Sequence, residues 1–245
     1  MPRYKLTIEY NGAPFCGWQR QQNGRGVQQA VEEAIHAIAP DSPSIIAAGR
    51  TDAGVHAIGQ VAHCDLPMEW EENRLLRSLN HFLYPEPVSV VAVEPVAADF
   101  HARFDARARQ YLYRVLSRPA RPVLLEGMVW HVHKPLDIEA MRAGAAHLIG
   151  HHDFTTFRSV HCQSASPVKT LDRLDITEID GEIRFHVHAR SFLHNQVRSF
   201  VGTLVQVGTG RWPPARVGEA LAAADRAACG PVASPDGLYL ERVFY

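Results

Sequence analysis

Apolar and polar residues alternate in two ways along the first hundred positions. From Tyr4 to Tyr10 every second residue is apolar or aromatic, which is typical of a half-buried strand. A helical spacing follows at Val27, Ala30, Val31, Ala34, Ile35 and Ile38. Strands are then expected at 45–48 and 61–66, a helix with Leu75, Leu76, Leu79, Phe82 and Leu83 inward, and a strand at 88–93. The order strand, helix, strand, strand, helix, strand predicts an α+β lobe.

The second part of the chain repeats this layout. Residues 110–117 alternate as a strand, and an amphipathic helix follows Asp137, marked by Ile138, Met141, Ala145, Leu148 and Ile149. Strands at 171–179 and 182–191 form a hairpin, because the Asp180-Gly181 pair between them favours a type I′ turn. Helices at 194–208 and 214–228 and a strand at 238–244 complete the pattern. Because no linker separates the parts, we expect an α+β fold of two lobes, 1–105 and 106–245, that share one continuous sheet.

One carboxylate stands out at the end of a predicted strand. Asp52 follows the apolar run 45–48 and lies within GRTDAGVH, residues 49–56, with Arg50 two positions before it. The glycines of this segment allow backbone conformations that other residues avoid, so we expect a tight loop that presents Asp52 at its tip. An ordinary strand-terminating turn, in which the Asp side chain bonds its own backbone, would give the same pattern.

A long loop between the first strand and the first helix contains two aromatic residues. It reads NGAPFCGWQRQQNGRG and is rich in Gly, Asn and Gln. Phe15, Trp18 and Arg20 in an exposed loop would suit contact with unstacked RNA bases. Alternatively, Phe15 and Trp18 anchor the loop to the core.

The positive charge is unusual in kind and in place. The net charge is −1, yet the chain has 22 arginines against 3 lysines. Arginine suits bidentate phosphate contacts and stacking on bases, although a bias in codon usage would give the same ratio. Residues 101–121 hold one acid, Asp105, and six arginines, namely Arg103, Arg107, Arg109, Arg114, Arg118 and Arg121. This stretch predicts a phosphate-binding stripe.

Other classes of protein find little support in the composition. Four scattered cysteines without a C-x-x-C pair indicate free thiols, and histidine pairs such as His131/His133 lack the cysteines and carboxylates that would complete a metal site. No apolar run approaches 18 residues, and the N-terminus lacks the pattern of a signal peptide. A cytoplasmic protein without membrane or metal partners is therefore expected.

Four motifs together resemble one family. NGAPFCGWQRQ, GRTDAGVHA, FHARFDARARQYLYRV and SFLHNQVRSFVGTL look like the motifs of the tRNA pseudouridine synthase A family, in the same order and over nearly the whole chain. The resemblance implies a pseudouridine synthase fold of two ferredoxin-like halves around a central, mostly antiparallel sheet. It also implies a homodimer that isomerises uridines 38 to 40 of the tRNA anticodon stem-loop without a cofactor. Gln196, where an apolar residue is common, and the low overall charge depart from the family pattern.

The resemblance also implies roles for particular residues. Asp52 resembles the catalytic aspartate, Tyr111 the tyrosine that stacks on the target base, and Arg198 the arginine paired with the aspartate. Substrate contacts are expected from Tyr111 and from Arg50, Phe15, Trp18, Arg20, Arg103, Arg107 and Arg109. The 1–105 lobe would then carry the catalytic loop, and the 106–245 lobe the tyrosine and arginine.

The chemistry of this reaction explains why so few groups would suffice. The bond from C1′ to N1 must break, the uracil must turn, and its C5 must join C1′, which needs neither redox nor phosphate energy. A carboxylate can trap or stabilise the cationic transition state at C1′, as in glycoside hydrolysis. The sequence leaves open whether Asp52 adds to C1′ or assists formation of a glycal. It also leaves open a non-catalytic RNA-binding module and an Asp-dependent nucleosidase.

Overall fold

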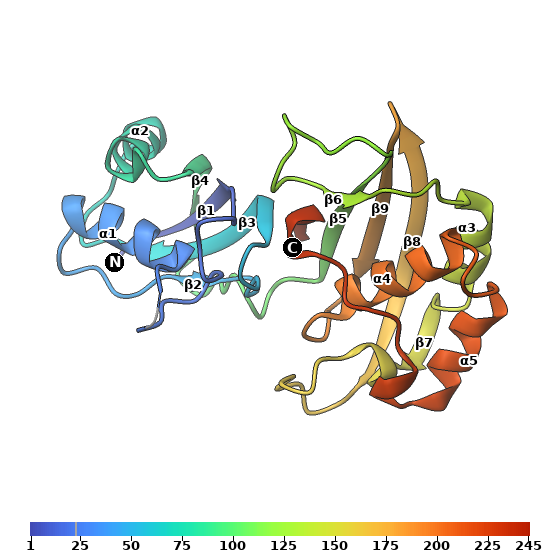
Figure 1. Ribbon diagram of the computed structural model, residues 1–245. Helices are drawn as coiled ribbons and strands as arrows, with labels where there is room; N and C mark the ends of the chain where they lie inside the picture. The colour runs from blue at the N-terminus through green and yellow to red at the C-terminus, as the bar shows by residue number, and fades with distance from the viewer. Residues whose placement is uncertain (23) are drawn as a thin grey trace. The chain divides into compact units, whose positions relative to one another are not determined.

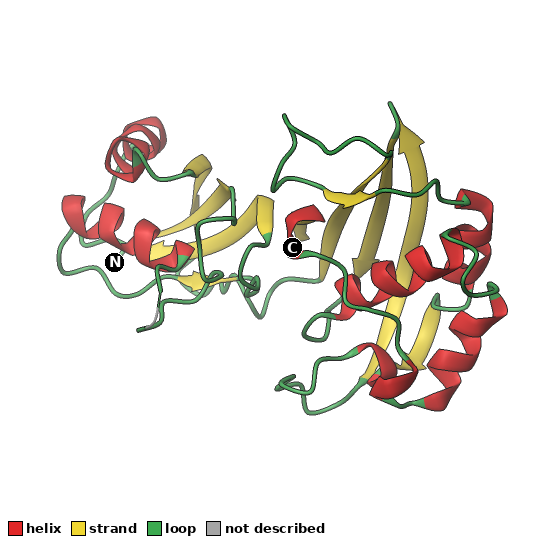
Figure 2. Ribbon diagram, viewed as in Figure 1, coloured by secondary structure: helices red, strands yellow, loops and turns green. Residues whose placement is uncertain are grey.

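A computed structural model describes residues 1–22 and 24–245, which form two compact units. The first unit contains residues 1–107 and 239–245, and the second contains residues 108–238. Both combine helices with mostly antiparallel strands (Figures 1 and 2). The expected α+β class is thereby confirmed. Among the described residues, no helix is both long and apolar enough to cross a membrane.

The first unit has a sheet in the order β4-β1-β3-β10. Its strands are β1 (Arg3–Tyr10), β3 (His56–Asp65), β4 (Val88–Val96) and β10 (Leu238–Phe244), with the short β2 (Ile46–Ala47) paired to β3. β1 runs antiparallel to β3 and β4, whereas β10 is parallel to β3 through Tyr239 and Leu240. The last strand of the chain therefore belongs to the sheet that the first strands build.

Two helices, α1 (Val27–Ile38) and α2 (Glu72–Leu83), pack together on this sheet (Figure 1). They cover the apolar side of β1, where Leu6 and Ile8 are fully buried. The expectation for Phe82 was wrong, because its side chain is 48% exposed. The inward stripe of α2 is Leu75, Leu79 and Leu83, and at 100° per residue Phe82 lies at the margin of that stripe.

The second unit has a sheet in the order β5-β9-β8-β7. Its strands are β5 (Ala108–Ser117), β7 (Gly150–Asp153), β8 (Val168–Ile179) and β9 (Glu182–Ala189), with β6 (Trp130–Val132) parallel to β5. Asp180 and Gly181 both have positive φ, at 53° and 75°, as the predicted type I′ turn of the β8–β9 hairpin requires. The register of this hairpin fixes which side chains of β9 face the core.

Three helices pack on one another in this unit: α3 (Ile138–Ala146), α4 (Gln196–Gly208) and α5 (Ala215–Ala223). Phe154, Phe157 and Phe200 form an aromatic core beneath α4, with ring centroids 5.1 to 6.4 Å apart. Single turns lie at η1 (Thr155–Phe157), η2 (Arg226–Ala228) and η3 (Pro235–Gly237). The expected helix 214–228 is in fact α5 followed by η2, because Ala224 takes a left-handed conformation that ends α5.

Candidate functional site

The segment around Asp52 is a tight turn in the first unit. The backbone N–H of Val55 donates to the carbonyl of Asp52 at 3.1 Å, and Gly54 between them has φ +77°. Such a φ strains other residues, so Gly54 is suited to this position. Asp52 is half-buried, and Arg50 and Ala53 on either side are exposed. The predicted loop is therefore present and places the Asp52 side chain within reach of solvent.

Neighbouring segments hold the backbone of this turn. The N–H of Trp18 donates to the Thr51 carbonyl at 3.0 Å, and the Gln60 amide donates to the Gly49 carbonyl at 2.9 Å. The hydroxyls of Tyr10 and Thr51 form a buried hydrogen bond of 2.7 Å. The backbone on the N-terminal side of Asp52 is thus fixed from three directions.

Two glycines let the 11–18 loop approach the Asp52 turn closely. A Cβ on Gly12 would lie 2.0 Å from the Val55 carbonyl oxygen. A Cβ on Gly17, whose φ is +97°, would lie 2.7 Å from the Thr51 carbonyl oxygen. The N–H of Gly12 also donates to Nδ1 of His56 at 3.0 Å. The two motifs that contain Gly12 and Asp52 are therefore parts of one packed substructure.

Phe15 and Trp18 are buried in this substructure, at 4% and 2% exposure. This is the arrangement expected if they anchor the loop to the core. Such buried rings leave almost no surface on which an RNA base could stack. Arg20 lies on the exposed side of the same loop and pairs with Glu32 at 3.4 Å.

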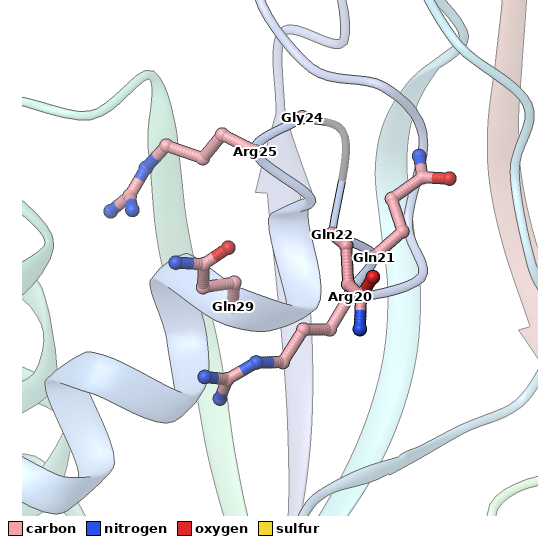
Figure 3. Close-up of a pocket in the computed structure, with 6 residues that line it drawn as sticks. All are labelled: Arg20, Gln21, Gln22, Gly24, Arg25 and Gln29. Carbon is pink, nitrogen blue, oxygen red and sulfur yellow. The ribbon is translucent and has the colours of Figure 1, made fainter.

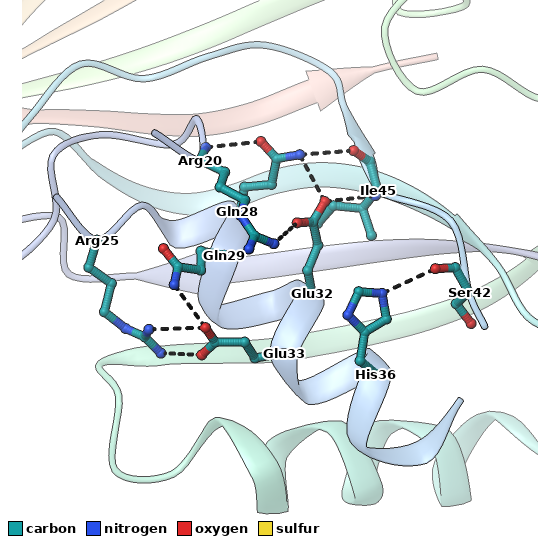
Figure 4. A network of polar contacts seen from close by, with 9 residues as sticks. All are labelled: Arg20, Arg25, Gln28, Gln29, Glu32, Glu33, His36, Ser42 and Ile45. Carbon is teal, nitrogen blue, oxygen red and sulfur yellow. Dashed lines mark hydrogen bonds and ion pairs between the residues drawn. The ribbon is translucent and has the colours of Figure 1, made fainter. Parts of the chain in front are cut away.

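Glu32 is the centre of a polar network on α1 (Figure 4). Its buried carboxylate accepts hydrogen bonds from the Gln28 amide at 2.9 Å and from the N–H of Ile45 at 3.3 Å. Because Ile45 directly precedes β2, this network fixes the segment that leads into the Asp52 loop. On the exposed side of α1, Arg25 lowers the pKa of Glu33 through a hydrogen bond.

A polar hollow of about 530 Å³ lies beside this network (Figure 3). It is lined by Arg20, Gln21, Gln22, Gly24, Arg25 and Gln29. Arg25 forms ion pairs of 2.7 Å with both Glu33 and Glu86. Arg20 is the lining cation whose own side chain is most exposed to solvent.

In the second unit, Tyr111 lies on β5 opposite Val187 of β9. It is half-buried, and the Phe192 ring meets it edge to face at a centroid distance of 5.1 Å. Tyr113, two residues on, is fully buried and donates its hydroxyl to the Ser234 carbonyl at 2.6 Å. Burial raises the pKa of Tyr113 well above its usual range. Tyr113 is therefore a core residue, while Tyr111 is only half-buried.

Arg198 lies in the first turn of α4 and is half-buried. Its Nε donates to the Ala233 carbonyl at 2.8 Å, and its Nη1 donates to the Asn195 side-chain oxygen at 3.0 Å. Asn195 has φ +63° and begins the helix two residues later than expected. Gln196 is buried, and its side-chain oxygen accepts the N–H of Leu193 at 2.8 Å. Gln196, at a position where an apolar residue is common in the family, thus provides a hydrogen-bond acceptor for the turn before α4.

The predicted arginine stripe is divided between the two units. Arg103 and Arg107 are exposed in the first unit. In the second, Arg109 donates to the Arg190 carbonyl at 2.9 Å, and Arg114 pairs with Glu182 at 2.6 Å. Arg114 therefore neutralises a buried acid of the sheet, whereas Arg118 and Arg121 further along the predicted stripe are exposed.

The histidine pairs form ordinary polar contacts. His131 on β6 bonds the Arg118 carbonyl at 2.7 Å, and His152 on β7 bonds the Ile149 carbonyl at 2.8 Å. In the described part of the chain, no three or more His, Cys, Asp and Glu side chains gather as metal ligands would. These histidines have structural partners of their own.

Sequence reasoning missed the residues that support the Asp52 loop. Tyr10 read as a strand residue and Gln60 fell just before an expected strand, yet both bond the loop. The only local signals were glycines, Gly12 and Gly17, in a segment that otherwise reads as an irregular loop. Contacts between positions 10 and 51 depend on chain pairing that no local pattern reveals.

Comparison with known proteins gives a consistent result. The family described as tRNA pseudouridine synthase matches residues 6–105 and 145–245. A tRNA pseudouridine synthase A of Cereibacter sphaeroides is 60% identical over 100% of this chain and 98% of its own length. Those of Roseobacter denitrificans and Paracoccus denitrificans are 59% and 57% identical, covering 100% of this chain and 96% and 97% of their own. A solved Cbf5-Nop10-Gar1 complex has a TM-score of 0.42 at 11% identity, over 97% of this chain and 48% of the other, which is too weak to support an argument.

Proposed function

Because this chain belongs to the tRNA pseudouridine synthase family, we propose that it isomerises uridine to pseudouridine at positions 38, 39 and 40 of the tRNA anticodon stem-loop. The full-length identity of 60% to a tRNA pseudouridine synthase A supports this substrate. The observation that carries the proposal is the braced Asp52 turn, which places a half-buried carboxylate on a fixed backbone.

We propose that Asp52 acts at C1′ of the target uridine. As the bond from C1′ to N1 breaks, positive charge develops at C1′, and a carboxylate held in place stabilises it or captures it covalently. The fixed turn matters because a group that is already oriented needs no rearrangement during the reaction. Re-attachment through C5 displaces Asp52 from C1′ if the carboxylate has captured it, releases the C5 proton to solvent and leaves N1 to take up a proton.

We propose that Tyr111 and Arg198 complete the site. Tyr111 is half-buried, and its ring would provide a stacking surface for a flipped base, whose removal from the helix costs a few kcal/mol. Arg198 would pair with Asp52 and place a guanidinium cation beside the carboxylate. In this proposal the first lobe supplies the acid, and the second supplies the aromatic platform and the cation.

Exposed cations would hold the rest of the tRNA. Arg20, Arg50, Arg103 and Arg107 are exposed, and Arg109 is half-buried. Contacts of this kind to phosphate position a nucleic acid without reading its sequence. We further propose that the enzyme works as a homodimer in the cytoplasm and needs no cofactor, because the isomerisation is redox-neutral and consumes no phosphate energy.

Release of tritium from tRNA labelled at C5 of uridine tests the proposal. Wild-type protein should release tritium from unmodified tRNA, and mapping of the products should place pseudouridine at positions 38 to 40. Free uracil instead of pseudouridine would show a nucleosidase. Binding of tRNA with neither product would show a non-catalytic RNA-binding protein.

A further inference from the structure

In the first unit, Phe104 is exposed to solvent and has no role in the proposed chemistry. The Phe104 side chain is 76% exposed, whereas Phe15, Phe154, Phe157, Phe185 and Phe200 are buried. Phe104 lies in a turn between β4 and β5, within the motif FHARFDAR. A single exposed apolar residue is common on protein surfaces. The geometry of the turn and the charge around the ring make this residue different.

The turn that carries Phe104 is rigid. The side chain of Asp105 accepts the N–H of His101 at 2.8 Å, and the His101 carbonyl accepts the N–H of Asp105 at 3.0 Å. Nδ1 of His101 accepts the N–H groups of Arg103 and Phe104 at 3.2 and 3.3 Å. The backbone on both sides of the ring is therefore fixed before any partner binds.

The same turn is tied to the body of the first unit. The N–H of Ala102 donates to Nδ1 of the buried His63 at 3.1 Å, and the Tyr245 hydroxyl donates to the Ala102 carbonyl at 2.7 Å. Desolvation by burial lowers the pKa of His63 and so favours the neutral ring that accepts this bond. The turn that carries Phe104 is therefore hydrogen-bonded both to β3 and to the C-terminal residue.

Groups around the ring suit a nucleobase. The His101 ring lies 4.3 Å from the Phe104 ring at 32°, and the Arg103 guanidinium carbon lies 5.8 Å from its centroid. Since the residue is 76% exposed, these neighbours leave much of it open to solvent. Arg103 and Arg107 place two exposed cations within three residues of it. Aromatic rings beside arginines bind single-stranded nucleic acid by stacking and phosphate contact.

We propose that Phe104 stacks on an unpaired base of the bound tRNA, while Arg103 and Arg107 contact the phosphates beside that base. The identity of the RNA rests on the proposed function. The two arginines favour RNA over an apolar protein surface as the partner. The phosphates of RNA complement the positive charges, whereas an apolar surface would have to desolvate them without compensation. Because the turn that carries Phe104 is already ordered, tRNA binding does not have to pay the entropic cost of ordering it.

Binding of a fluorescent, unmodified tRNA transcript to Phe104→Ala, Phe104→Leu and Phe104→Trp tests this contact. Stacking of one base corresponds to about 5- to 150-fold in Kd. The Ala and Leu variants should therefore bind at least about fivefold more weakly, and Trp should bind as the wild type does. Leu separates stacking from apolar contact, because it keeps apolar bulk without a flat ring. Phe82→Ala, which removes a half-exposed ring that also contacts a histidine, is the matched control and should bind normally.

Two results would overturn the proposal. Unchanged tRNA affinity in Phe104→Ala would mean that no base stacks there. A fall in molecular mass of that variant, measured by light scattering, would mean that a second copy of the chain covers the ring. Tritium release in the same samples separates this inference from the proposed function: wild-type protein that binds tRNA through Phe104 without isomerising uridine would refute only the latter.

Discussion

The two units hold their proposed catalytic groups in different ways. In the first unit, Tyr10, Trp18 and Gln60 bond the backbone and the Thr51 side chain beside Asp52. In the second, the Arg198 guanidinium itself bonds Ala233 and Asn195. The position of the acid therefore depends on residues that never need to touch the substrate. The Arg198 guanidinium is held by hydrogen bonds that it makes itself, so replacing Arg198 would also remove these bonds.

The largest effect is expected from replacement of Asp52, the proposed catalytic group of the first unit. Asp52→Asn keeps the size of the side chain but removes the charge that we propose stabilises C1′. We expect tritium release to fall by on the order of 10³-fold or more, with tRNA affinity and unfolding free energy nearly unchanged. Asp41→Asn, at an exposed acid outside the 49–56 loop, should keep full activity. Substantial turnover by Asp52→Asn, free of wild-type contamination, would remove Asp52 from the mechanism.

Replacement of Arg198 should combine a catalytic and a structural loss. We expect Arg198→Ala to lower kcat by roughly 10²-fold, as loss of one preorganised electrostatic group does, with tRNA affinity much less affected. Arg198→Lys should recover part of the rate, because it restores charge without the planar fork.

A structural control for this variant exists in the same unit. Arg142 on α3 also donates to a backbone carbonyl, that of Ile176, at 2.7 and 2.9 Å. Arg142→Ala should lose stability while keeping kcat at a temperature where the protein is folded. An Arg198→Ala protein that behaves like Arg142→Ala would reduce Arg198 to a structural role.

The local elements were largely predictable from the sequence, and the long-range contacts were not. Periodicity located both helices of the first unit and the β8–β9 hairpin, and Asp180-Gly181 determined its turn. It could not show that residues 239–245 join the sheet of β1 and β3, because that pairing links Tyr239 to His56 across the chain. Asp52 could be singled out by its glycines, whereas Tyr10 and Gln60 could not, since their bonds span 41 and 11 positions.

The Tyr10 hydroxyl tests whether residues outside the Asp52 turn position the Asp52 carboxylate. Tyr10→Phe leaves the Thr51 hydroxyl without this buried 2.7 Å bond, which should cost about 1 to 3 kcal/mol of unfolding free energy. We also expect kcat to fall about tenfold with KM little changed, because the Asp52 turn loses one of its fixed points. Thr51→Val should act in the same way, and the double variant should be no worse than either single one.

Tyr4→Phe is the matched control for Tyr10→Phe. Tyr4 is a buried tyrosine of the same strand, and its hydroxyl bonds the backbone of Trp70 at 2.8 and 3.1 Å. It should lose comparable stability while keeping kcat. Equal losses of kcat in the two variants would show that β1 acts on activity only through stability.

The smallest effect on activity is expected from an acid that belongs to the scaffold of the second unit. Glu182 is buried and pairs with Arg114 at 2.6 Å and Arg184 at 2.7 Å. Burial acts to raise the pKa of Glu182, but hydrogen bonds from both arginines outweigh it, so the pKa lies below the usual 4.5. The stabilisation is then fully present above pH 4.5 and is lost as the pH falls through the lower folded-state pKa.

Glu182→Gln should therefore lower the unfolding free energy in urea by about 1 to 3 kcal/mol at pH 7, and the gap to wild type should close below pH 4.5. At pH 7 and a temperature where both proteins are folded, tritium release should stay within about twofold, because Glu182 supports the sheet and not the reacting groups. Glu219→Gln, in an exposed pair with Arg216 on α5, should change stability by less than about 1 kcal/mol at either pH. A gap between Glu182→Gln and wild type that persisted unchanged at pH 3 would show that packing, and not the charge of Glu182, stabilises this end of the sheet.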